Sequence, residues 1–231
     1  MKRHTLSILL LILCFSKAIS QTKIGINIAG GWGVGDAYNN FDAQLGIPVS
    51  FALHKRLHLV TGLELSRKNN LNQAISPKRR VSGDEPTILG SSPNYIFDAQ
   101  QFSIYYLQVP ILAKIEGRRL TCQAGLVSSV GLFGNSKTYE RAYYKGWFYS
   151  VAEKIPDTEN LKTLNFDSDK IKRFDLALQI GWGLRWDKTA VHLVTNQGLV
   201  NLNNNPQFNK MHNRNILISV DYFFGNKDKE Q

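Results

Sequence analysis

The chain has 231 residues, with 28 Lys and Arg against 18 Asp and Glu, for a formal net charge of +10. Its two cysteines exclude a small fold held together by several disulfides. No run approaches the roughly 20 consecutive apolar residues of a membrane-spanning helix, so a location in a membrane would require strands.

The first 20 residues are typical of a secretory signal peptide, with an apolar core from Leu6 to Phe15 and a small-residue cleavage site at Ala18-Ile19-Ser20. We therefore predict a signal peptide at residues 1–20 and one exported domain at residues 21–231. Cys122 would be the single cysteine left after cleavage, which excludes an intrachain disulfide. Because the basic excess is spread thinly over an exported chain, we expect no nucleic-acid partner.

Eight later stretches alternate apolar residues with polar or small residues at period two, as strands with two different faces do. They cover about residues 23–34, 41–53, 57–66, 105–115, 120–132, 174–186, 189–199 and 215–224. From the second connection onward, short turns alternate with long connections, and two long ones cover about residues 68–100 and 135–172. This pattern predicts an all-β fold: an eight-stranded antiparallel up-and-down transmembrane β-barrel with short periplasmic turns and long extracellular loops.

The polarity of the two strand faces indicates which one meets lipid. One face carries almost only Leu, Ile, Val and aromatic residues, whereas charged and small residues share the other. Since eight strands enclose too little room for so many large apolar side chains, we predict that the apolar face contacts lipid. Aromatic residues near both sets of strand ends fit the two interfaces of an outer membrane: Trp182, Trp186, Tyr222 and Phe224 at one, and Trp32, Phe41, Tyr105 and Phe174 at the other.

Two prolines interrupt otherwise regular strands. Pro48 and Pro110 each lie inside a predicted central strand, where proline removes one donor from the hydrogen-bond ladder. We therefore expect a bulge or a local gap in the pairing at both positions.

Six charged residues fall on the predicted inner face and need partners in a low-dielectric interior. They are Lys114, Arg185, Asp221, Glu64, Asp42 and Asp175. Lys114, Arg185 and Asp221 lie near the periplasmic ends of their strands, so we predict a cluster there in which Arg185 or Lys114 pairs with Asp221. A structural plug is the favoured interpretation of these charges, and a gate or a proton path is the alternative.

The sequence offers little that indicates catalysis. No His-x-x-x-His or Cys-x-x-Cys spacing indicates a metal site, and the glycine-rich run from Gly30 to Gly35 lacks the last glycine and the helix of a nucleotide loop. His192 is predicted to point inward without a recognisable serine partner. We therefore predict no enzyme and no cofactor. The alternatives are a lipid-modifying enzyme at the rim, testable at His192 and Ser129, and a narrow channel.

Two predicted outer loops carry candidate contact residues. Basic residues in the second loop could meet anionic lipopolysaccharide, although a solvated loop is the favoured interpretation: Arg67, Lys68, Lys78, Arg79 and Arg80. Aromatic residues in the third loop suit contact with protein or glycan, or else fold over the barrel mouth: Tyr143, Tyr144, Trp147, Phe148 and Tyr149.

The segment from Tyr106 to Lys114, Tyr-Leu-Gln-Val-Pro-Ile-Leu-Ala-Lys, resembles the proline-containing strand of PorT-like outer-membrane barrels of Bacteroidetes. The last strand, ending Ser219-Val220-Asp221-Tyr222-Phe223-Phe224, is also similar to that family. The resemblance implies a barrel domain in the outer membrane of a Gram-negative cell and, for one founding member, a part in type IX secretion. It implies no catalytic residues.

These observations predict a non-enzymatic outer-membrane barrel with a structural or interaction role, with a link to type IX secretion as a narrower option. The expected partners are outer-membrane lipids, including lipopolysaccharide, and other outer-membrane or secretion-system proteins.

Overall fold

The computed structural model describes residues 22–34, 41–80, 95–145, 150–154, 160–168, 171–204 and 211–224. The predicted signal peptide lies outside these residues. Ten β-strands are found in the described part of the chain. No helix in that part is long and apolar enough to cross a membrane.

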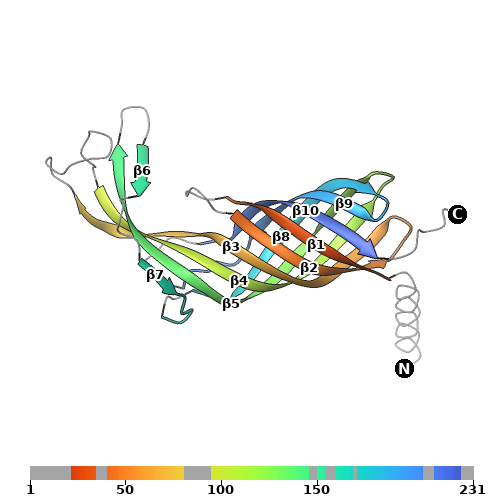
Figure 1. The fold of residues 1–231 in the computed structure, drawn as a ribbon, viewed down its shortest axis with the longest axis horizontal. Helices are drawn as coiled ribbons and strands as arrows, with labels where there is room; N and C mark the ends of the chain where they lie inside the picture. Colours follow the sequence, from red (N-terminus) through yellow and green to blue (C-terminus); the bar gives the residue numbers. More distant parts are fainter. Residues whose placement is uncertain are drawn as a thin grey trace, which may run out of the picture.

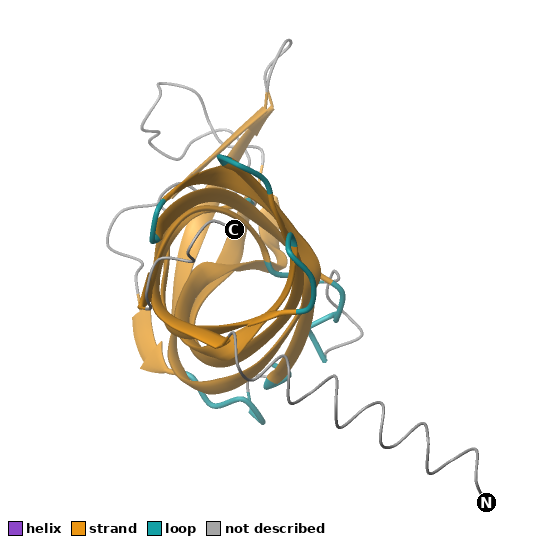
Figure 2. Ribbon diagram, turned by 90° about the vertical axis from the view of Figure 1, so that its right-hand side faces the viewer, coloured by secondary structure: helices purple, strands orange, loops and turns teal. Residues whose placement is uncertain are grey.

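Eight of the ten strands close into a barrel, which confirms the predicted fold (Figures 1 and 2). All pairings around the ring β1-β2-β3-β4-β5-β8-β9-β10 are antiparallel, and the pairing of β10 with β1 closes it. The strands are β1 Thr22–Gly33, β2 Phe41–Ala52, β3 Leu57–Arg80, β4 Tyr95–Glu116, β5 Leu120–Lys145, β6 Ser150–Lys154, β7 Asn160–Thr163, β8 Phe174–Trp186, β9 Thr189–Gly198 and β10 Arg214–Phe224.

The two faces of the barrel wall are those that the period-two pattern predicts. Large apolar side chains point outward and are exposed, for example Trp32 at 63%, Leu63 at 58% and Leu120 at 66%. Polar side chains point inward and are buried, with Asp175 and His192 at 0% exposure. A wall that is apolar outside and polar inside is stable only where the outer face meets hydrocarbon.

Both prolines produce the expected local gap. The pairing of β1 with β2 skips two residues on each strand at Pro48 without a change of register, and the pairing of β3 with β4 does the same at Pro110. On their other edges the ladders continue, with Pro48 opposite Gly62 and Pro110 opposite Val127. The missing N–H of each proline therefore interrupts one ladder only.

The two long connections predicted at about residues 68–100 and 135–172 are partly β-strand in the structure, which the sequence pattern did not predict. Strands β3, β4 and β5 have 24, 22 and 26 residues, whereas about 9–11 suffice to cross a membrane. Beyond the barrel they form one sheet that β6 and β7 join along β5 (Figure 1). We call residues 72–80, 95–101 and 137–145 the outer extension. Because both faces of a hairpin outside the membrane can contact water, neither face has to be apolar. Most residues of the outer extension therefore show no clear period-two alternation.

Candidate functional site

The barrel interior holds the polar side chains that the sequence singles out, and its short-turn end centres on Glu116. The Glu116 carboxylate accepts a hydrogen bond from the Arg185 guanidinium and lies 3.1 Å from Lys114 Nζ. His58 Nε2 lies 3.5 Å from the same carboxylate. Lys114 Nζ also lies 5.0 Å from the centre of the Phe223 ring. One carboxylate therefore serves two cations and an imidazole.

The predicted pairing of Arg185 or Lys114 with Asp221 is wrong, because both cations form their ion pairs with Glu116. The predicted fourth strand ends at about residue 115, so Glu116 falls in the turn that follows it. The inward series of that strand, which includes Leu112 and Lys114, reaches Glu116 when continued by two residues. The period-two pattern was thus a signal that could have found this residue.

Asp221 belongs to a second group of buried side chains, centred on His192. His192 Nδ1 lies 3.2 Å from Asp221 Oδ2, and Thr121 Oγ1 lies 2.7 Å from His192 Nε2. Asn27 Nδ2 donates to the Asp221 carboxylate and, at 2.7 Å, to Ser219 Oγ. These residues come from β1, β5, β9 and β10, so the group ties together strands far apart in the sequence.

The order hydroxyl, imidazole, carboxylate is that of a nucleophile with its base and orienting acid. Here Thr121 is 1% exposed and His192 is 0% exposed, so a substrate cannot reach the hydroxyl. Ser129, the serine considered in the sequence analysis, accepts a hydrogen bond from Gln108 at 2.8 Å instead. The arrangement fits a buried polar network that fixes the strands, not an accessible catalytic site.

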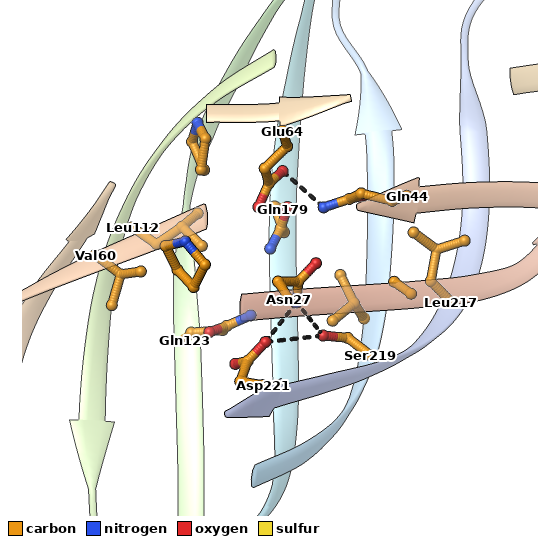
Figure 3. A pocket seen from close by; sticks show the side chains of 14 residues that line it. Asn27, Gln44, Val60, Glu64, Leu112, Gln123, Gln179, Leu217, Ser219 and Asp221 are labelled. Carbon is orange, nitrogen blue, oxygen red and sulfur yellow. Dashed lines mark hydrogen bonds between the residues drawn. The ribbon is translucent and has the colours of Figure 1, made fainter. Parts of the chain in front are cut away.

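Glu64 lies in the middle of the barrel, beside a cavity of about 20 Å³ (Figure 3). Gln44 Nε2 donates to Glu64 Oε2 at 2.6 Å. Glu64 also lies over Gly46, where an added Cβ would come within 2.6 Å of its Cγ. The cavity is lined by the Glu64 and Asp221 carboxylates together with amides and apolar side chains, among them Gln123, Gln179 and Leu112. The large Glu64 side chain over Gly46 is typical of the packed interior of a narrow eight-stranded barrel.

Asp42 and Asp175 lie toward the long-loop end. Asp42 accepts hydrogen bonds from Asn215 Nδ2 at 2.8 Å and from the Asn69 backbone N–H at 2.9 Å. Asp175 accepts from Asn213 Nδ2 and lies 3.3 Å from Lys68 Nζ. The loop interpretation of Lys68 is therefore wrong: it is 3% exposed and paired inside the barrel, because β3 continues through it.

An apolar cluster closes the long-loop end. Inward side chains of β4 pack there against residues from the segments 160–168, 171–204 and 211–224. Its members are Phe102, Ile104, Tyr106, Leu164, Phe166, Ile171, Leu202 and Met211. Backbone hydrogen bonds hold these segments over the mouth, including Leu164 N to Gly134 O at 2.9 Å and Leu202 N to Met211 O at 2.8 Å. We call this cluster the apolar plug.

The six predicted inner charges are therefore all inside the barrel but do not form one cluster. Lys114 and Arg185 share Glu116, and Asp221 lies with His192. Each of the other three has a separate amide partner: Gln44 for Glu64, Asn215 for Asp42 and Asn213 for Asp175. Among the aromatic candidates, Tyr143 and Tyr144 lie on β5, but their side chains are outside the described residues, as are Trp147, Phe148 and Tyr149 entirely. Their role as a contact surface stays a prediction.

A closed barrel with an apolar outer wall and a packed polar interior defines an integral outer-membrane barrel protein. More particularly, the chain belongs to the family described as outer membrane protein beta-barrel domain, whose sequence profile matches residues 19–204. No curated protein matches the chain significantly.

The chain is also similar in outline to several small barrels of known structure. Ail of Yersinia pestis is 10% identical, with a TM-score of 0.37 over 88% of this chain and 97% of that chain. Neisserial surface protein A is 8% identical, with a TM-score of 0.39 over 88% and 97%. The N-terminal barrel of Pseudomonas aeruginosa OprF is 9% identical, with a TM-score of 0.31 over 87% and 97%.

Proposed function

We propose that the protein is a non-enzymatic scaffold of the outer membrane whose barrel anchors an extracellular contact surface, the outer extension. The observation that carries this proposal is the length of β3, β4 and β5, which run together far past the residues needed to cross the bilayer. A purely structural barrel has no need of a sheet of this length outside the membrane. Loops and extensions above a rigid barrel are where recognition is placed in such proteins.

The packing of the interior supports a scaffold over a channel. Ion pairs cross the short-turn end, amide side chains fill the middle, and the apolar plug covers the other end. A pore would need a continuous wet path, whereas the plug residue Phe102 is 0% exposed. The packed interior thus acts as a rigid base for the extension.

Burial of Thr121 and His192 supports a non-enzymatic role over a lipid-modifying enzyme at the rim. Partnership with lipopolysaccharide, other outer-membrane proteins or secretion components is part of the proposal. The narrower option, a part in type IX secretion, is supported by the resemblance of the strand around Pro110 and of the last strand to PorT-like barrels.

Site-specific crosslinking in intact cells tests the proposal. A photoreactive residue would replace Leu161 on β7, which is 68% exposed, or Ser76 in the outer extension. The matched control carries it at Lys55 in a short turn at the opposite end. We expect discrete crosslinked partners at Leu161 or Ser76 that are absent at Lys55.

A shortened chain, with an Asn-Gly turn joining Ala74 to Ala99, provides the second arm, because these two residues pair directly. It should keep the barrel and lose the crosslinks at Leu161. Unchanged crosslinks in the shortened chain would overturn the proposal. Secretion components among the partners would favour the narrower option.

A further inference from the structure

The short-turn end of the barrel carries a ring of basic residues that the proposed function does not use. Three described turns join neighbouring strands there: β2 to β3, β4 to β5, and β8 to β9. The first two expose two basic side chains each, Lys55 with Arg56 and Arg118 with Arg119. The third carries Lys188, which is half-buried.

Backbone hydrogen bonds fix each turn to the next strand around the ring. The Arg56 carbonyl accepts from the Glu116 N–H at 2.8 Å, and the Arg119 carbonyl accepts from the Arg185 N–H at 2.7 Å. The Lys188 carbonyl accepts from the Phe223 N–H at 2.9 Å. The basic residues are therefore held on a rigid rim and not on free loops.

The acidic residues of this rim do not neutralise the ring. Asp187 is the exposed acid among the described turn residues. The other carboxylate nearby, Glu116, is already engaged by Lys114 and Arg185 from inside the barrel. Lys55, Arg56, Arg118 and Arg119 thus leave an excess of positive charge facing outward from this end.

The ring lies directly beside the band of side chains that meets hydrocarbon. Arg56 precedes Leu57, which is 37% exposed, and Arg119 precedes Leu120, which is 66% exposed. Lys188 follows two residues after Trp186, which is 53% exposed. A cation one or two residues beyond the apolar band lies at the depth of lipid phosphates, with a tryptophan at the same interface.

We propose that this basic ring binds the phosphate groups of anionic phospholipids in the leaflet at the short-turn end of the barrel. Guanidinium groups suit phosphate because they donate two parallel hydrogen bonds. A membrane is the favoured source of the phosphate because Arg56 and Arg119 each directly precede an exposed leucine of the apolar wall, so the charges lie at the edge of the surface that meets lipid.

The test uses the refolded full-length mature chain in vesicles of phosphatidylcholine and phosphatidylglycerol at 3:1. After mild detergent extraction, native mass spectrometry counts the lipids that each protein retains. We expect the wild type to retain phosphatidylglycerol at a roughly fivefold enrichment over its share of the vesicle. The variant K55Q/R56Q/R118Q/R119Q should retain the two lipids in their vesicle ratio.

The matched control is K162Q/K172Q, which removes two exposed basic residues at the long-loop end and should keep the enrichment. Heat-modifiable gel mobility confirms that each variant is folded before its lipids are counted. Equal retention of both lipids by the wild type, or undiminished enrichment in the fourfold variant, would overturn the proposal. A third result would also overturn it: the wild type binds isolated peptidoglycan, the fourfold variant does not, and neither protein prefers one lipid over the other.

Discussion

Arg185 on β8 and Glu116 on β4 form an ion pair across the barrel interior, bridging over β5, which lies between their strands. The same carboxylate lies 3.1 Å from Lys114 Nζ. A pair that skips a strand fixes the barrel cross-section in a way that neighbouring ladder bonds do not. Glu116 is therefore the anchor of the short-turn end.

Replacing Glu116 with Gln should destabilise the barrel, because Lys114 and Arg185 would lose their shared counter-charge. Lys114 is 1% exposed, but Arg185 is part-exposed, so we expect a loss of about 1–3 kcal/mol in the free energy of unfolding. Urea unfolding in lipid vesicles, followed by tryptophan fluorescence, measures it. Asp187→Asn, at an exposed turn position, is the control, and equal stability of both variants would contradict the assignment.

The Asp221–His192 contact can be measured by a double-mutant cycle. Asp221→Asn and His192→Gln each remove one side of the contact, and the double variant removes both. Because the two side chains lie 3.2 Å apart in a buried network, we expect a coupling energy of about 0.5–3 kcal/mol. Strict additivity of the two single effects would show that the residues do not interact.

A single charged substitution on the outer face of the barrel tests whether that face contacts the hydrocarbon core of the membrane. Leu126 points outward on β5, paired with Ile111 and Leu178. Leu126→Arg should cost about 2–4 kcal/mol near the bilayer midplane. Leu161→Arg, on β7 outside the barrel wall, should leave the unfolding free energy unchanged. If both arginines are tolerated equally, the outer wall does not meet hydrocarbon.

We expect Phe166 to anchor the segment 160–168 to the barrel through its packing in the apolar plug. An added Cβ at Gly131 would come within 2.8 Å of the Phe166 ring, which shows how closely the ring seats on the barrel. Phe166→Ala should release the loop and speed trypsin cleavage at Lys162 and Arg173 in whole cells, while the barrel stays folded. Leu161→Ala, an exposed neighbour, should keep the wild-type cleavage rate; a similar rate in the two variants would refute the role of Phe166.

Much of the barrel follows from local sequence, because lipid outside and packed side chains inside impose a strict alternation. The inward direction of Lys114, Asp175 and Asp221 was predicted in this way. Their partners were not, since strand register decides which inward residues meet. Thr121 contacts His192 only because β5, β8 and β9 pair in one particular register.

The other sequence predictions that were wrong or incomplete concern segments outside the membrane, where no period-two alternation of apolar and polar residues is required. Lys68 and the residues after it are polar enough to be taken for a loop, yet hydrogen bonds to β4 carry β3 on to Arg80. The plug was missed because Phe166, Leu202 and Met211 come from connections without periodicity. Such contacts depend on how segments return to the barrel mouth.

The length of β5 has one more consequence. Its last ten residues, 136–145, span roughly 30 Å along the strand at about 3.3 Å per residue. That length is comparable to the roughly 30 Å thickness of the hydrocarbon core of a bilayer. A partner that contacts the far end of β5 therefore need not lie against the lipid itself.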